Sequence, residues 1–214
     1  MSSLGATAER CEAAIAGAAE PPVGDLERAA GALVRRLSTL ARLADDLFRG
    51  MEFGFLFDPA RKLFAIGYSV SDGSLDPNCY DLLASEARLT SFIAIAKGDV
   101  PSTHWFRLGR ALTPVDRGSA LISWSGSMFE YLMPSLVLSS PPSSLFDLTC
   151  RLVVRRQIEY GRKRGVAWGV SESGYNARDL EMTYQYSNFG VPGLGLRRGL
   201  SDDVVVAPYA TALA

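Results

Sequence analysis

The chain has 214 residues, of which 48% are hydrophobic, and a formal net charge of −1. This length and composition predict a globular protein with one sizeable core. Because the 22 basic residues are spread along the chain, neither nucleic acid nor an anionic membrane surface is expected as a partner. The single histidine, His104, argues against a histidine-based metal site and against a Ser-His-Asp triad. We interpret His104 as a hydrogen-bonded structural residue, and we expect no metal and no cofactor.

The cysteines and the apolar runs bear on the cellular compartment. Three cysteines are widely spaced and form no CxxC motif, which favours a reducing compartment and buried thiols. No run of about eighteen apolar residues occurs, so no transmembrane helix is expected within this chain. The N-terminus lacks the basic start and apolar core of a signal peptide. We therefore expect the chain by itself to be soluble.

The N-terminal part of the chain predicts two segments. Residues 1–24 are rich in Ala, Gly, Ser and Glu and predict a flexible leader. From Asp25, an N-cap residue, apolar residues recur at spacings of three and four, which predicts an amphipathic connector helix over residues 25–49 that ends at Gly50. The apolar stripe of this helix needs a partner, and the body of the domain is the simplest one.

Two elements are predicted next. Aromatic and apolar residues that alternate on either side of a proline-containing turn predict a β-hairpin over residues 51–72. Asp76 and Pro77 then predict the start of a helix that runs to about Lys97 and ends at Gly98. This helix is apolar nearly all round, so we expect it to be buried on most sides.

Glu86 falls at the centre of that apolar helix. An unpaired buried carboxylate is costly, so Glu86 must be paired, protonated or open to a wet cavity. Arg88 points to a different side of a helix and is a poor local partner. Glu86 is therefore a candidate functional residue, and the alternative is a buried structural ion pair with a distant Arg or Lys.

The rest of the chain predicts shorter elements around one more long helix. Residues 99–123 are expected to form loop and short turns, and residues 124–134 a glycine-bearing loop that leads into a short helix. A capping-box spacing predicts a helix over residues 145–163. Residues 177–186 predict a short helix or turn, and residues 204–214 a strand-like run that becomes helical. The predicted architecture is mainly α with a small β-hairpin.

The stretch 168–176 holds Glu172 among an indole, a phenol, two hydroxyls, an amide and two glycines. Glycines let the backbone approach a ligand closely, aromatic rings offer flat faces and polar groups offer hydrogen bonds. This mixture suits a sugar, and the alternative is a polar surface loop. Residues 124–134 and 184–190 are two more polar-aromatic clusters. The first of them contains Glu130, which could be catalytic, bind sugar hydroxyls or cap a helix.

Five motifs carry a resemblance to a known family, at residues 55–59, 80–88, 124–134, 168–173 and 184–187. They resemble the glycoamylase-like module of bacterial cyclic β-1,2-glucan synthases. Residues 1–49 resemble only the helical connector that precedes this module. The resemblance implies that residues 50–214 are the N-terminal part of an (α/α)6 barrel, truncated at its C-terminus. It also implies a large multi-pass inner-membrane parent, in which this module lies on the cytoplasmic side without touching the membrane itself.

The activity implied by the resemblance is closure of linear β-1,2-glucan into a ring by retaining transglycosylation. The implied partners are a β-1,2-glucan oligosaccharide and the remaining modules of the synthase. By motif position Glu172 is expected to be the nucleophile and Glu86 the acid/base, acting directly or through a sugar hydroxyl. A retaining enzyme needs one ionised and one protonated carboxyl about 5 Å apart. An apolar helix raises the pKa of a carboxyl such as Glu86, and a loop rich in glycine and hydroxyls keeps Glu172 ionised.

Further side chains are expected to bind the substrate. Aromatic residues would stack on glucose rings, with core packing as the alternative role of each: Trp124, Phe129, Trp168, Tyr175, Tyr184 and Tyr186. Sugar hydroxyls would be held by Gln185, Asn188 and Glu130. Because the chain predicts about half of the helices of a barrel, we expect weak or no activity from it alone. The alternatives are a non-catalytic glucan-binding module, an inactive fragment, or an interaction segment formed by the helix at 25–49.

Overall fold

The chain divides into two compact units, Met1–Glu52 and Phe53–Ala214. The computed structural model describes residues 23–214. The predicted leader over residues 1–24 therefore lies almost wholly outside the described residues. Across the described part of the chain, no helix combines the length and the apolar character that crossing a lipid bilayer requires.

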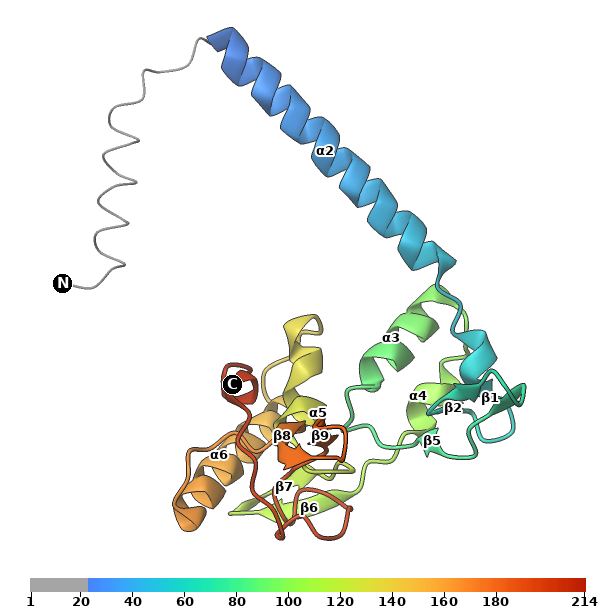
Figure 1. Cartoon of the computed structure of the whole chain (residues 1–214). Coiled ribbons are helices and arrows are strands. Elements are labelled where there is room, and N and C mark those ends of the chain that lie inside the picture. Colours follow the sequence, from blue (N-terminus) through green and yellow to red (C-terminus); the bar gives the residue numbers. More distant parts are fainter. Residues whose placement is uncertain (1–22) are drawn as a thin grey trace, which may run out of the picture. The chain divides into compact units, whose positions relative to one another are not determined.

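Helix α2 (Val23–Gly50) is the element that the structure describes in the first unit, and it confirms the helix predicted at 25–49 (Figure 1). Its leucine stripe is exposed, with Leu37 at 55% and Leu40 at 61%. In the last turn Arg49 pairs with Asp45 at 2.7 Å, an arrangement that suits the negative end of the helix dipole.

The second unit begins with small antiparallel sheets. Strand β1 (Phe57–Asp58) pairs with β2 (Leu63–Ala65), which confirms a hairpin within residues 51–72, although a shorter one than predicted. Residues before β1 form a single 3₁₀ turn, η1 (Gly54–Leu56), instead of extending the strand. The structure adds three more strands. Strands β3 (Tyr68–Ser69) and β4 (Ser74–Leu75) form a second hairpin, and β5 (Cys79–Tyr80) is the third strand of the first sheet.

The helix predicted from residue 77 was wrong over its first half, because α3 (Arg88–Lys97) begins only at Arg88. The Asp76 carboxylate accepts the backbone N–H of Asn78 at 2.7 Å in a turn and starts no helix. The next residues then pair as strand β5 with β2, so their backbone groups bond a neighbouring strand. Phe92 is 49% exposed, so the helix is not buried nearly all round either. Its predicted end is confirmed, since Gly98 adopts a left-handed φ of 82°.

Residues 99–123 hold more regular structure than the loop and turns predicted. Helix α4 spans Thr103–Arg107, and β6 (Leu112–Val115) forms a hairpin with β7 (Gly118–Leu121). This hairpin packs on the long helix α6, where the Thr149 hydroxyl accepts the backbone N–H of Leu121 at 3.2 Å.

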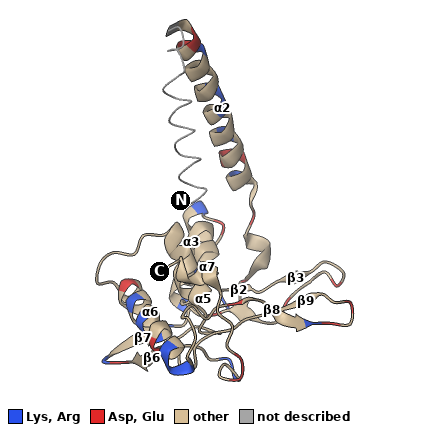
Figure 2. Cartoon of the chain, turned by 60° about the vertical axis from the view of Figure 1, so that its left-hand side comes forward, with Lys and Arg blue, Asp and Glu red and all other residues tan. Residues whose placement is uncertain are grey.

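Two predicted helices are confirmed in the middle of the chain. A short helix, α5 (Met128–Leu132), follows the glycine-bearing loop and continues into the 3₁₀ helix η2 (Met133–Leu136). Helix α6 (Leu145–Arg164) begins where the capping spacing predicted, and Figure 2 marks several Lys and Arg positions along its ribbon. Its buried side carries Val153 and Gln157.

The C-terminal part contains a β-ribbon where a short helix or turn was predicted at 177–186, and that prediction was wrong. Strand β8 (Ser173–Arg178) pairs antiparallel with β9 (Tyr184–Ser187). Both strands alternate between more and less exposed residues, the period of two that a strand imposes. The predicted change from extended to helical structure at the end is confirmed, because Val206 bridges to Val170 and α7 (Pro208–Thr211) follows.

The prediction of a mainly α fold that forms part of an (α/α)6 barrel was wrong. Among residues 23–214, only α2 and α6 are long helices, of 28 and 20 residues, and the strands form four small antiparallel sheets. Two of the three polar-aromatic stretches, 168–176 and 184–190, contribute to the β8–β9 ribbon where a barrel would need linkers between helices (Figure 1). The main core gathers around α5 and α6, with Met128, Tyr131 and Val153 nearly inaccessible to solvent.

His104 is fully buried in a smaller aromatic setting, as the structural interpretation expects. Its imidazole Nδ1 lies 2.9 Å from the carbonyl oxygen of Lys62, and Nε2 lies 2.8 Å from the Ser91 hydroxyl. The rings of Phe57 and Phe64 lie edge-on to it. Burial lowers the pKa of His104 below its ordinary value of 6.5, although the bond to Lys62 opposes this.

We predict that the His104 site makes stability depend on pH. The unfolded chain takes up a proton as the pH falls below about 6.5, whereas the folded site resists it, so stability present above that pH is lost in more acidic solution. Between about pH 7.5 and pH 5.5 the wild-type chain should therefore lose more free energy of unfolding than His104→Gln, with a slope difference of up to about 1.4 kcal/mol per pH unit. Urea unfolding at several pH values measures this, and parallel pH profiles for the two proteins would contradict it.

Candidate functional site

The segment before Glu172 is fixed through its backbone. The buried amide of Gln157 on α6 donates from Nε2 to the Val170 carbonyl and accepts the Val170 N–H, both at 2.8 Å. The Gly169 carbonyl accepts the backbone N–H of Ala207 at 2.9 Å. These bonds hold the segment between α6 and the residues that precede α7.

Gly169 is required by the packing of α7 against this segment. Its φ is 111°, and a Cβ at this position would lie 2.4 Å from the Thr211 hydroxyl oxygen on α7. That hydroxyl in turn donates to the Trp168 carbonyl at 3.2 Å. Only glycine allows α7 to lie this close to the segment.

Tyr209, a residue that the sequence did not single out, positions Glu172. The Tyr209 hydroxyl on α7 donates to the Glu172 carbonyl at 2.8 Å and lies 3.0 Å from the Ser171 hydroxyl. The Ser171 hydroxyl accepts the backbone N–H of Phe129 at 3.1 Å, and the Phe129 ring lies edge-on to Tyr209. No spacing in the sequence connects Tyr209 to Glu172, so no sequence signal could have found this contact.

Glu86 lies in the turn just before α3. The Ser85 hydroxyl donates to the Glu86 carboxylate at 3.1 Å. Arg88 donates to two backbone carbonyls of α5, those of Glu130 at 3.2 Å and Tyr131 at 2.9 Å, and its charge partly opposes the rise in the Glu86 pKa. Its guanidinium also lies 4.3 Å from the centroid of the Phe146 ring. Arg88 and Glu86 thus interact through their charges, while the hydrogen bonds of the guanidinium go to backbone carbonyls.

The structure brings Glu86 and Glu172 into one electrostatic environment. Burial raises the pKa of Glu172 above its ordinary value of 4.5, and the negative charges of Glu86 and Glu130 raise it further, while a hydrogen bond with the Tyr186 hydroxyl opposes them. Burial likewise raises the pKa of Glu86, and the charge of Glu130 adds to this. Segments next to both residues also bond α5, through Ser171 and through Arg88.

Two tyrosines border the pair. Burial raises the pKa of Tyr80, and the charges of both Glu86 and Glu172 add to the effect. Burial together with the carboxylate of Glu172 raises the pKa of Tyr186 to about 12. Both hydroxyls thus stay protonated and can donate hydrogen bonds at neutral pH.

Glu130 is buried, and the structure shows it in the capping role. Its side chain is 7% exposed, and its carboxylate accepts the Ser123 hydroxyl at 2.8 Å and the Ser125 hydroxyl at 2.7 Å. The backbone N–H groups of Ser125 and Ser127 donate to it as well. Together with the Ser127 hydroxyl it forms a capping box at the start of α5. Its predicted contact with sugar hydroxyls stays a prediction.

The other predicted substrate-binding residues differ in exposure. Three aromatic rings are more than half exposed, namely Trp124, Tyr184 and Tyr186. Partly buried rings belong to Phe129, Trp168 and Tyr175. Gln185 donates to the Asp179 carboxylate at 3.1 Å, and the exposed Asn188 accepts Arg197 at its carbonyl. Contact of any of these residues with a sugar stays a prediction.

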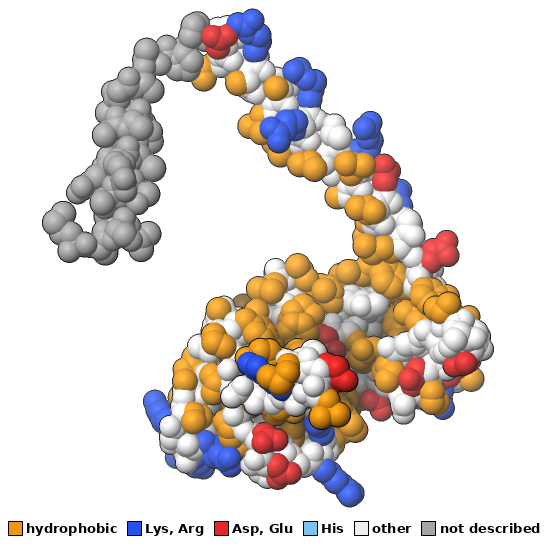
Figure 3. Space-filling view, viewed as in Figure 1, with side chains coloured by type: hydrophobic (Ala, Val, Ile, Leu, Met, Phe, Trp, Pro, Cys, Tyr) orange, Lys and Arg blue, Asp and Glu red, His pale blue; other side chains and the backbone are white. Residues whose placement is uncertain are grey.

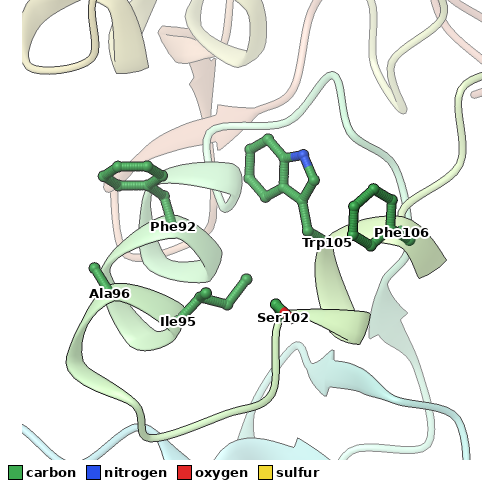
Figure 4. Close-up of a pocket in the computed structure, with 6 residues that line it drawn as sticks. All are labelled: Phe92, Ile95, Ala96, Ser102, Trp105 and Phe106. Carbon is green, nitrogen blue, oxygen red and sulfur yellow. The ribbon is translucent and has the colours of Figure 1, made fainter.

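Two hollows of the second unit lie away from the glutamates. One, of about 430 Å³, lies between α3 and α4 and has an apolar lining that includes Phe92, Trp105 and Phe106 (Figure 4). The other, of about 590 Å³, lies between the β6–β7 turn and α6. Figure 3 shows a face of the second unit that is hollowed and carries acidic atoms on its walls.

Within residues 23–214, no group of three or more His, Cys, Asp and Glu side chains could hold a metal ion.

The sequence pattern of the glycoamylase family, described as putative glucoamylase, matches residues 78–214, which is more than half of the chain. The chain belongs to the glycoamylase family. It is also similar to the cyclic beta-(1,2)-glucan synthase NdvB of Rhizobium meliloti (strain 1021), with 56% identity over 183 residues. That match covers 86% of this chain but 6% of the synthase, so the chain spans a small part of its relative. The resemblance drawn from the five motifs is thereby confirmed, and the chain is a carbohydrate-active module.

The family match contains the site. It begins after β4 and includes Glu86, Glu172 and Tyr209, whereas α2 lies outside it. The residues that fix the glutamates are therefore part of the glycoamylase-family region.

We predict that the two glutamates titrate as a pair. In a carboxyl-selective NMR titration both pKa values should lie above 4.5, and Glu86→Gln should lower the pKa of Glu172 because it removes one of the charges that raise it. Glu159 on α6 is the internal control, since its ion pairs with Lys163 and Arg156 lower its pKa. An unchanged titration of Glu172 in Glu86→Gln would show that the two groups do not interact.

Proposed function

We propose that this chain is the part of a longer synthase that closes linear β-1,2-glucan into a ring by retaining transglycosylation. Glu172 is the nucleophile and Glu86 is the acid/base. The observation that supports the proposal is the attachment of both segments to α5, through Ser171 beside Glu172 and through Arg88 near Glu86, and the charge of Glu86 raises the pKa of Glu172. The name of the similar rhizobial protein, a cyclic beta-(1,2)-glucan synthase, supports the choice of substrate.

The proposed reaction has two balanced steps. The carboxylate of Glu172 attacks the anomeric carbon of one glucose unit and forms a glycosyl ester, while the bond to the 2-oxygen of the next unit breaks. Glu86 gives its proton to that departing oxygen, directly or through a sugar hydroxyl. The 2-hydroxyl at the far end of the same chain then attacks the ester, returns a proton to Glu86 and releases Glu172.

The assignment of roles rests on motif position. Burial is the largest effect at both carboxyls and raises both pKa values, while a hydrogen bond opposes it in each, from Tyr186 at Glu172 and from Ser85 at Glu86. Since two carboxylates in one region resist ionising together, the pair holds one proton over part of the pH range.

The cyclisation test uses a whole synthase. The segment of the rhizobial protein that matches this chain is replaced by this chain, and the products are analysed by mass spectrometry, in which a ring is one water lighter than the linear glucan. We expect Glu172→Gln and Glu86→Gln each to lower ring formation by about 100-fold or more, because each removes a group that reacts. Glu159→Gln, a change on the surface of α6, should leave it unchanged. Wild-type ring formation in both site variants would sink the catalytic assignment and favour the non-catalytic binding module.

The role of each glutamate is tested by rescue with azide. An aryl β-glycoside of a β-1,2-linked gluco-oligosaccharide is supplied, so that the leaving group needs no acid. Glu172→Ala should then give the α-glycosyl azide, because azide replaces the nucleophile directly. Glu86→Ala should give the β-glycosyl azide, because the glycosyl ester still forms and azide opens it. The opposite pairing of products would exchange the two roles.

A further inference from the structure

The β8–β9 ribbon has one packed face and one open face. On the packed face, the Tyr175 ring lies edge-on to Phe189 with ring centroids 5.0 Å apart. The other face carries exposed residues from both strands, among them Gly174, Tyr184 and Tyr186. Because residues two apart on a strand share a face, the two tyrosine rings stand on the same open side.

The register pairs these open-face residues across the ribbon. Gly174 lies opposite Tyr186, and Arg178 lies opposite Tyr184. The Arg178 guanidinium lies 4.3 Å from the centroid of the Tyr184 ring and bonds the hydroxyl of that residue. Tyr184 is thus already covered on one side by its cross-strand partner. Tyr186 has a partner without a side chain.

Neither the backbone nor the packing requires glycine at position 174. A Cβ built there would meet only the Gln185 carbonyl oxygen, at 3.9 Å, and the φ of Gly174 is not in the left-handed region. Gly190 is different, because a Cβ there would lie 1.8 Å from the Ser125 carbonyl oxygen. Glycine within a strand weakens it and often marks the close approach of a ligand. The space that a side chain at position 174 would fill is therefore empty and lies on the open face of the ribbon.

This space lies next to the proposed nucleophile. Gly174 is two residues beyond Glu172, and Tyr186, its cross-strand partner, is near enough for the Glu172 carboxylate to raise the pKa of its hydroxyl. The ring of Tyr186 is 64% exposed, so it keeps a free apolar surface beside the opening. A flat, exposed ring beside bare backbone suits the C–H face of a pyranose, whose rim of hydroxyls can bond backbone and polar groups.

We propose that Gly174 is a substrate-binding residue, and that a β-linked glucose unit lies over its backbone and stacks on the ring of Tyr186. This inference rests on the proposed function, because it takes the substrate from there. It assigns to the open face the binding of the glucose unit beside Glu172. A larger side chain at position 174 would occupy the space of that unit while leaving the ribbon intact.

The test is a binding measurement on the chain itself. Calorimetric titration with a linear β-1,2-linked gluco-oligosaccharide is carried out on wild type, Gly174→Val, Tyr186→Ala and Ala177→Val. Ala177 lies on the less exposed side of β8, so it is the matched control for adding a branched side chain. We expect Gly174→Val and Tyr186→Ala to raise Kd by about tenfold or more. Ala177→Val should leave Kd within about twofold of the wild-type value. Thermal unfolding should show Tm unchanged or raised in Gly174→Val, since valine favours a strand.

Each result decides between this inference and the proposed function. Wild-type affinity in Gly174→Val overturns the inference and leaves the proposed function standing. Loss of affinity in Gly174→Val, with normal ring formation in Glu172→Gln, supports the inference and overturns the catalytic proposal. A wild-type chain that does not bind the oligosaccharide overturns the inference, whereas the cyclisation assay in the whole synthase still judges the proposed function.

Discussion

The site depends on one buried amide. Gln157 offers a donor and an acceptor to the N–H and C=O of a single residue, Val170, and both hydrogen bonds are 2.8 Å long. Losing such a partner would leave two buried backbone groups unsatisfied, at a cost of about 1–3 kcal/mol each. These two hydrogen bonds fix the backbone two residues before Glu172 and so limit the positions that its carboxylate can take. Tyr209 then holds the carbonyl of Glu172 from the other side.

Helix α5 connects both glutamates to the same frame. The backbone N–H of Phe129 donates to Ser171, the neighbour of Glu172, and the carbonyls of α5 accept the Arg88 guanidinium close to Glu86. Burial lowers the pKa of Arg88 to about 10, so it remains charged at neutral pH and its bonds to these carbonyls persist. The buried carboxylate of Glu130 stabilises the first turn of α5 through its capping box. A carboxylate that stood out in the sequence as a possible catalyst therefore acts as support for the other two.

The sequence predicted those elements whose signals are local, and it failed where distant segments pair. Ser144 starts α6 as predicted, because a cap is formed by residues three positions apart. Asp76 carries the same kind of signal, but the strand that follows bonds β2, a contact that no local pattern reveals. The same reason applies to the site. Glu86 and Glu172 stood out by their surroundings in the sequence, whereas Gln157 and Tyr209 act on backbone groups of remote residues, and their own neighbours give no hint of it.

The failure of the barrel prediction does not bear on the proposed chemistry of the site, because the two rest on different interactions. A fold class concerns how long elements pack, while a site concerns how a few side chains are held. Here every contact that holds Glu172 comes from within residues 78–214, the region that matches the glycoamylase family. Gly169 and Gly174 make the same distinction on a smaller scale. Gly169 is required by packing against α7, whereas nothing in the packing requires glycine at position 174. The inferred glucose unit therefore accounts for Gly174 and not for Gly169.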